Sequence, residues 1–260
     1  MTDDIEEVRQ LTSEIDGCLS DDEGELLYKL AKKVASGQAI VEIGSWKGKS
    51  TVWLAKGTEA GQGNKVYSID PCRTNNANVN EDERSTYTTF LSSLTKAGVQ
   101  DTVVPLVKTS DEVAKGWRKK IGLLWFNAPY KYEDVEHTLL LWKRHLFPGA
   151  KIALHACDQP GLARLVEEYL KNLGDFTIIE SINTVIVAET DNCIHYWIID
   201  SSDIGVCKHC KKERDFKRLL RRSPEVKREE KAKEAKWKAQ KKTPSYIRKG
   251  SEREKRRKAS

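Results

Sequence analysis

Short apolar runs rich in β-branched residues recur through the middle of the chain and alternate with stretches of helical periodicity. The runs predict strands at Ala39–Ile43, Lys65–Ile69, Thr102–Val107, Gly122–Phe126, Lys151–Leu154, Phe176–Glu180 and Thr184–Ala188. Helices are expected between the first five runs, over Ser50–Lys56, Ser85–Ala97, Asp111–Lys119 and Glu133–Leu146, and after the fifth, over Gly161–Leu173. This alternation favours an α/β fold in which helices cover both faces of a mostly parallel sheet.

Changes of composition divide the chain into four zones. These are a helical segment over 1–36, an α/β domain over 37–190, a Cys/His segment over 191–210 and a basic tail over 211–260. In the first zone, Ser20 and Glu23 have the spacing of a capping box, and Gly37 is expected to follow the helix. In the second, only Ser181–Asn183 separates the last two strands. A parallel crossover needs a dozen or more residues, so these strands are predicted to form a C-terminal antiparallel hairpin.

The first strand runs into a glycine loop, Gly44-Ser45-Trp46-Lys47-Gly48, which precedes a predicted helix. Such a loop brings backbone N–H groups and a helix N-terminus to one point, which suits an anionic or polar ligand. The spacing is one residue too short for a phosphate-binding P-loop, which disfavours a nucleotidase of that kind. Trp46 occupies the second glycine position of a dinucleotide fingerprint, which excludes that class as well.

The pattern Glu42-x-Gly44-x-x-x-Gly48 resembles the first motif of class I S-adenosylmethionine-dependent methyltransferases, and most closely the methyltransferase-24-type branch. The resemblance extends over about residues 20–190 and implies a Rossmann-like methyltransferase fold that binds S-adenosylmethionine. It implies a cofactor site made of loop residues and of acids that follow the second and third strands: Glu42, Gly44, Ser45, Gly48, Asp70 and Asp111. In this family the acid at Asp70 holds the ribose hydroxyls, the loop shapes the methionine end, and the region of Asp111 contacts adenine.

The positions that carry catalytic groups in this branch are altered. The fourth strand usually ends in I-D-G-D-H and the fifth in H-D, whereas here Asn127 and Pro129 replace the two acids and Ala156 follows His155. Two interpretations stay open. The domain is either a methyltransferase that needs no metal, with His155 or Tyr130 beside the substrate, or a domain that binds the cofactor without transferring methyl.

Four residues with the chemistry of zinc ligands lie close together after the hairpin. Cys193-x-His195 and Cys207-x-x-Cys210 predict a closed structural site with three cysteines and one histidine. His209 is a rival ligand, and free thiols are the alternative to a metal site. The intervening residues Tyr196–Ile199 are expected to form a strand.

Charge is unevenly distributed along the chain. All 260 residues carry 45 Lys and Arg against 39 Asp and Glu, a formal net charge of +6. Residues 211–260 carry 22 Lys and Arg against 8 Asp and Glu, so the tail has a net charge of +14 and the rest has −8. A nucleic-acid backbone is the expected partner of such a tail, and a solvated extension is the alternative.

Two classes of function follow from these features. One is a methyltransferase that acts on an oxygen or nitrogen atom of a small-molecule or macromolecular acceptor. The other is a non-catalytic, nucleic-acid-binding adaptor on a methyltransferase-like scaffold. The sequence shows neither an apolar run as long as a membrane span nor a basic and then apolar start typical of a signal peptide. A cytoplasmic location with reduced cysteines is therefore expected.

Overall fold

A computed structural model describes residues 2–72, 86–127, 131–155, 159–171 and 176–217. The chain divides into two compact units, Met1–His195 and Tyr196–Ser260. The first unit contains a seven-stranded sheet and the second a three-stranded sheet. Within the described residues, no helix combines the length and the apolar character of a membrane span.

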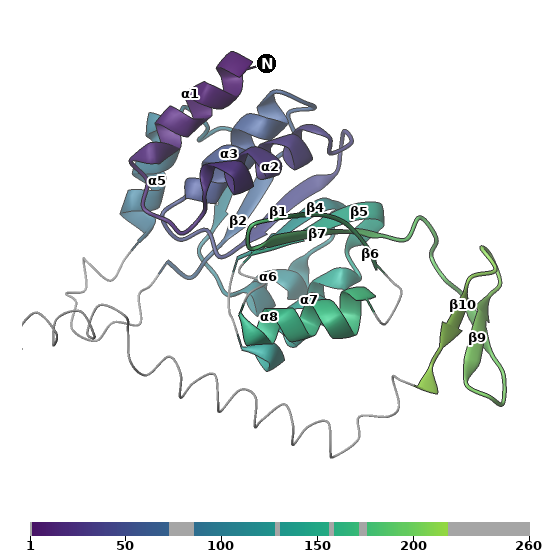
Figure 1. Ribbon diagram of the computed structural model, residues 1–260. Coiled ribbons are helices and arrows are strands. Elements are labelled where there is room, and N and C mark those ends of the chain that lie inside the picture. The colour runs from purple at the N-terminus through teal and green to yellow at the C-terminus, as the bar shows by residue number, and fades with distance from the viewer. Residues whose placement is uncertain (1, 73–85, 128–130, 156–158, 172–175, 218–260) are drawn as a thin grey trace, which may run out of the picture. The chain divides into compact units, whose positions relative to one another are not determined.

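The large sheet has the strand order β3-β2-β1-β4-β5-β7-β6 (Figure 1). Its strands are β1 (Ala39–Ile43), β2 (Val66–Ile69), β3 (Val103–Leu106), β4 (Ile121–Phe126), β5 (Leu146–Leu154), β6 (Phe176–Ile182) and β7 (Val185–Thr190). The first five pair in parallel, and β7 is antiparallel to both β5 and β6. The prediction of a mostly parallel sheet with a C-terminal antiparallel hairpin is confirmed.

Helices cover both faces of this sheet (Figure 1). On one face lie α1 (Thr2–Ser13), α2 (Asp21–Lys32), α3 (Lys49–Glu59) and α5 (Tyr87–Lys96). On the other lie α6 (Ser110–Gly116), α7 (Tyr132–Lys143), α8 (Pro160–Leu165) and the π-helical turn η1 (Val166–Lys171). Successive side chains of a strand point to opposite faces, so Leu123 and Trp125 of β4 enter the first core while Leu124 and Phe126 enter the second.

Helices α2 and α3 approach each other so closely that glycine is required at the contact. A Cβ atom on Gly24 of α2 would lie 2.3 Å from the Trp53 ring of α3. A Cβ atom on Gly57 of α3 would lie 2.4 Å from the carbonyl oxygen of Tyr28. The second contact is with backbone, which cannot rotate away, so any side chain at Gly57 would push the two helices apart.

The N-terminus of α2 is also hydrogen-bonded to the turn of the β6–β7 hairpin. The predicted capping box is confirmed, since Ser20 Oγ accepts from the Glu23 N–H and the Glu23 carboxylate accepts from the Ser20 N–H. The other oxygen of Glu23 accepts hydrogen bonds from the N–H and the hydroxyl of Thr184, at 3.1 and 2.8 Å. Thr184 lies in the turn between β6 and β7, so one buried carboxylate joins the cap of α2 to this turn.

The second unit is built on the antiparallel strands β8 (Trp197–Ile199), β9 (Ile204–Cys207) and β10 (Glu213–Asp215), in the order β10-β9-β8. The strand expected over Tyr196–Ile199 is therefore present. The rings of Trp197 and Phe216 meet edge to face with their centroids 5.5 Å apart. Between residues 196 and 217, only Gly205 and Cys207 are buried. This sheet consequently has very little apolar core of its own.

Candidate cofactor-binding and catalytic site

The loop after β1 is shaped by two glycines with left-handed backbone conformation. Gly44 has φ +88° and Gly48 has φ +93°, values that residues with a Cβ atom rarely adopt. The Gly44 N–H donates to the Ile69 carbonyl at the end of β2, and the Gly48 N–H donates to the Ser45 carbonyl. Gly48 then forms the N-cap of α3. The loop therefore has a defined path from the end of β1 to the start of this helix.

Glu42 forms buried hydrogen bonds with the helix that follows this loop and with β2. Its side chain is fully buried and accepts hydrogen bonds from Ser50 Oγ and Thr51 Oγ1 of α3, both at 2.5 Å. Ser68 Oγ of β2 donates to it at 2.7 Å. Burial raises the pKa of Glu42 to about 7 against the opposing effect of these hydrogen bonds. The Glu42 side chain of β1 therefore joins the first turn of α3 to β2, next to the glycine loop.

Asp70 follows β2 and reaches the loop directly. Strands β1 and β2 pair in parallel with Ile43 opposite Ile69, so their carboxyl ends meet at one edge of the sheet. Asp70 Oδ2 accepts from the Trp46 N–H at 2.9 Å, and Oδ1 accepts from the Cys72 N–H at 2.6 Å. A carboxylate has about four acceptor positions, so each oxygen can accept a further hydrogen bond. The half-buried Asp70 can therefore hold the loop and receive two hydroxyl groups at the same time.

Asp111 lies in the first turn of α6, where Thr109 and Glu112 form a second capping box. Its Oδ2 atom is 2.7 Å from His137 Nε2 of α7, and the two side chains are 49% and 60% exposed. The Trp142 indole N–H of α7 donates to the hydroxyl of the adjacent Ser110 at 2.7 Å. Two side-chain contacts therefore join the start of α6 to α7 and hold Asp111 at the surface.

His155 lies in a buried row of polar side chains that begins at the glycine loop. Asn127, at the end of β4, donates from Nδ2 to the Gly44 carbonyl at 3.2 Å. Its Oδ1 atom is 2.6 Å from His155 Nδ1, so this imidazole nitrogen carries the donated proton. His155 Nε2 is 3.9 Å from Glu23 Oε2, and the His155 residue is only 5% exposed. The row links Gly44, Asn127, His155 and Glu23.

Sequence reasoning missed Glu23 as a neighbour of His155. The capping-box pattern accounted for it locally and gave no sign of a distant partner. Burial tends to raise the pKa of Glu23, but the hydrogen bonds from Ser20 and Thr184 outweigh it and the net shift is downward. Glu23 is therefore an ionised group beside His155 at neutral pH.

Several predicted positions lie outside the described residues. Tyr130 is one of them, as are Pro129 and Ala156. Of the basic tail, only residues 211–217 are described, so its nucleic-acid partner stays a prediction. The catalytic roles expected for Tyr130 and His155 likewise stay predictions.

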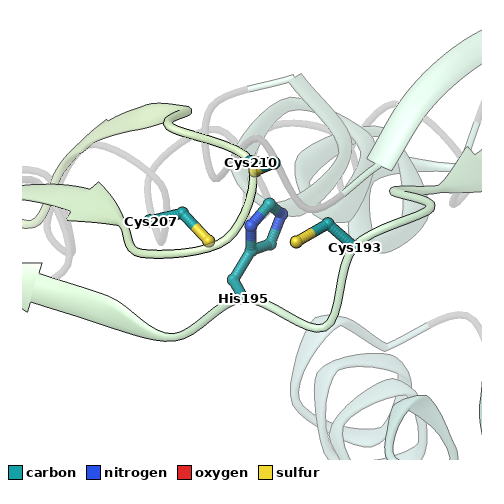
Figure 2. A group of neighbouring side chains, drawn as sticks. All are labelled: Cys193, His195, Cys207 and Cys210. Carbon is teal, nitrogen blue, oxygen red and sulfur yellow. The ribbon is translucent and has the colours of Figure 1, made fainter.

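The four Cys/His residues are brought together. One ligand atom from each of Cys193, His195, Cys207 and Cys210 can be chosen so that all lie within 4.8 Å of one another. Figure 2 shows the sulfur atoms of Cys193 and Cys207 extending toward the His195 imidazole. His195 Nε2 is 2.7 Å from Asp191 Oδ2. This candidate metal centre comes from one continuous segment, with Cys193 and His195 just before β8 and Cys207 at the end of β9.

Comparison with known proteins supports the methyltransferase resemblance. A family model described as a methyltransferase domain matches residues 41–157. The O-methyltransferase TomG from Streptomyces achromogenes, solved with S-adenosylmethionine, is 20% identical, with a TM-score of 0.52 over 72% of this chain and 89% of TomG. An O-methyltransferase from Bacillus cereus, solved with S-adenosylhomocysteine, is 17% identical, with a TM-score of 0.50 over 73% of this chain and 91% of that protein. A Corynebacterium glutamicum protein reaches a TM-score of 0.55 at 16% identity, over 75% and 92% of the two chains.

At these identities the solved structures establish the fold, and the family model establishes the relationship. The matched residues begin in β1, include the glycine loop and Asp70, and end just after His155. The domain built around residues 41–157 therefore matches the methyltransferase-domain family model, and its fold is that of the class I methyltransferases.

Proposed function

We propose that this domain binds S-adenosylmethionine at the carboxyl ends of β1 and β2 and transfers its methyl group to an acceptor atom. The observation that carries the proposal is the junction of Asp70 with the glycine loop. Asp70 accepts a hydrogen bond from the Trp46 N–H of the loop and Glu42 accepts two from the helix that follows the loop, while Asp70 keeps acceptor positions for a pair of hydroxyl groups. An oxygen acceptor is favoured, because TomG and the Bacillus cereus protein are both named O-methyltransferases.

The residues at this edge fit the chemistry of the cofactor. Gly44 and Gly48 leave the loop without side chains at two of its three left-handed positions, Trp46 being the third, so a ligand can approach the backbone there. Asp70 suits the vicinal ribose hydroxyls, because a carboxylate accepts two hydrogen bonds in parallel. Ser45 would contribute to the methionine end and Asp111 to the adenine end. When bound, S-adenosylmethionine supplies an electrophilic methyl group on a positively charged sulfur.

The chain's own contribution is mainly orientation. Asn127 stands where related domains carry an acid, so the end of β4 offers a neutral amide and not a carboxylate for a divalent cation. Its amide is already committed to the Gly44 carbonyl and to His155. We assign His155 a positioning role, since its burial and its two partners suit it to fixing Asn127 and the loop. Methyl transfer would then depend on holding the two reactants in line.

Calorimetry with S-adenosylmethionine and S-adenosylhomocysteine on the full chain tests this proposal. The wild-type protein should bind both. Asp70→Asn exchanges one acceptor oxygen for a donor and should weaken binding by about 10–100-fold, as expected for the loss of hydrogen bonds to a charged group. Asp101→Asn is a matched control, because this exposed residue lies just before β3, at the amino ends of the parallel strands and away from the proposed site.

Two results would count against the proposal in different ways. Absence of heat with both ligands would reject cofactor binding. Equal affinity of the wild type and Asp70→Asn would leave binding intact and reject the role of Asp70. Thermal unfolding of each variant, measured in the same buffer, separates loss of a contact from loss of the fold.

A further inference from the structure

We propose that Cys193, His195, Cys207 and Cys210 bind one Zn²⁺ ion, and that this ion takes the place of an apolar core for the β8–β10 sheet. The proposal is independent of methyl transfer, because none of these residues belongs to the cofactor site. It rests on the geometry of the four side chains, on the outer partner of the histidine and on the burial of the small sheet.

The four side chains are nearly placed for tetrahedral coordination. Zinc binds thiolate sulfur at about 2.3 Å and imidazole nitrogen at about 2.0–2.1 Å, so ligand atoms in a tetrahedral site lie about 3.5–3.8 Å apart. The four ligand atoms already lie within 4.8 Å of one another. Three thiolates and one imidazole form a donor set that favours zinc over magnesium or calcium.

The turn after β9 has the form needed to present two cysteines to one ion. The Cys207 N–H donates to the Lys212 carbonyl, and the Lys211 N–H donates to the Cys207 carbonyl. Lys211 adopts φ +63°, which turns the chain back toward β10. Cys207 is fully buried at the base of this turn. His209 lies in the same turn, is exposed and is not among the four clustered residues, which decides between the two candidate histidines.

Asp191 supplies the second observation that points to a metal. Its carboxylate lies 2.7 Å from His195 Nε2, so this nitrogen donates to Asp191 and Nδ1 is left to bind the ion. A carboxylate behind a ligating histidine is a recurrent feature of zinc sites, where it fixes the ring and increases the basicity of the ligand. The His195 side chain is only 9% exposed, so its orientation is well defined.

The small sheet has few other means of staying folded. Its three strands contain ten residues, and between residues 196 and 217 only Gly205 and Cys207 are buried. The Trp197–Phe216 contact and the Arg214 guanidinium, 5.7 Å from the Trp197 ring centroid, add a small aromatic cluster. Sheets of this size usually need a metal or disulfides, since their apolar burial does not offset chain entropy. The free energy of zinc binding would therefore be folding free energy for this segment.

Metal analysis of the full chain, purified without chelator, tests the proposal. The wild type should contain about one equivalent of zinc per chain, and Cys207→Ser should lose it. His209→Ala is the matched control and should keep the full equivalent. Asp191→Asn should retain the four ligands but lower zinc affinity by about 10–100-fold in competition with a chelator. Replacement of zinc by cobalt should give the visible absorption of a tetrahedral thiolate site.

Metal-free wild-type protein that does not take up added zinc would overturn the proposal. Loss of zinc from His209→Ala with retention in a His195→Ala variant would overturn the ligand set. Unchanged zinc affinity in Asp191→Asn would overturn the role of the outer carboxylate. Cys207→Ser changes a fully buried side chain and could prevent folding. In that case the Asp191→Asn and His209→Ala variants still test the site.

Discussion

Replacing Glu42 by glutamine removes a buried negative charge while keeping the shape of the side chain that joins α3 to β2, next to the glycine loop. The carboxylate is fully buried among Ser50, Thr51 and Ser68, which all donate to it. A glutamine amide retains one acceptor oxygen, and its NH₂ group can donate to a hydroxyl that turns to accept. Glu42→Gln therefore imitates the protonated form of the native residue.

The magnitude follows from the pKa of Glu42, which burial raises from 4.5 to about 7. The folded protein then keeps a proton that the unfolded chain has lost over this interval, so stability falls as the pH rises. The contribution of neutral Glu42 is complete below about pH 4.5 and has disappeared once the pH has passed about 7. Each pKa unit corresponds to about 1.4 kcal/mol, so the free energy of unfolding should lose about 3 kcal/mol relative to the glutamine variant.

Urea unfolding followed by tryptophan fluorescence, at several pH values between about 4 and 8.5, measures this difference. Other titrating groups act equally in both proteins and cancel when the two curves are subtracted. Glu180→Gln, at an exposed position of the edge strand β6, is the control and should give a difference that does not vary with pH. Parallel curves for the wild type and Glu42→Gln would refute the argument that burial governs the protonation of Glu42.

Three further predictions concern packing, the buried polar row and thiol reactivity. Gly57→Ala should destabilise the protein by about 1–3 kcal/mol in thermal or urea unfolding, because its Cβ would lie 2.4 Å from the backbone of α2. Gly116→Ala, where a Cβ meets nothing within 4 Å, should be neutral or slightly stabilising, and equal effects would contradict this account. Asn127→Ala should lower the free energy of unfolding by about 1–3 kcal/mol, because His155 Nδ1 loses its acceptor, and wild-type stability would argue against the polar row. Burial raises the pKa of Cys72 to about 11, so mass spectrometry should show slow alkylation of this thiol at pH 8 in the native protein and fast alkylation in urea. Equal rates in both states would disprove its protection.

Local sequence signals were sufficient for most of the fold. The β-branched runs predicted the strands of the large sheet, and the Ser20–Glu23 spacing predicted the cap of α2. The start of β5 was misplaced, because Pro148-Gly149 is typical of a turn. In the structure β5 begins at Leu146, where it pairs with Ile121 of β4 before Gly149 adopts φ +78°. That pairing depends on a neighbouring strand and cannot be recognised from the local sequence.

In the candidate sites too, local motifs were predictable from the sequence, whereas contacts between distant elements were not. The resemblance to the methyltransferase motifs predicted that Asp70 would join the glycine loop in one site, and spacing indicated that Cys193-x-His195 and Cys207-x-x-Cys210 could converge. The approach of Glu23 to His155 was not predictable in this way, because Glu23 comes from α2. Their meeting depends on how this helix packs across the sheet, which the periodicity of a segment does not encode.

The bond between α2 and the hairpin has a consequence for the order in which the domain is completed during synthesis. Glu23 is among the first buried polar residues to leave the ribosome, but Thr184, which provides two of its donors, follows 161 residues later. A nascent chain that stops short of this turn can form α2 and its cap, yet it lacks the two Thr184 donors to Oε1 of the carboxylate that α2 buries. We therefore expect the sheet domain to become stable late and in one step, when the last hairpin reaches the cap of a helix made near the beginning.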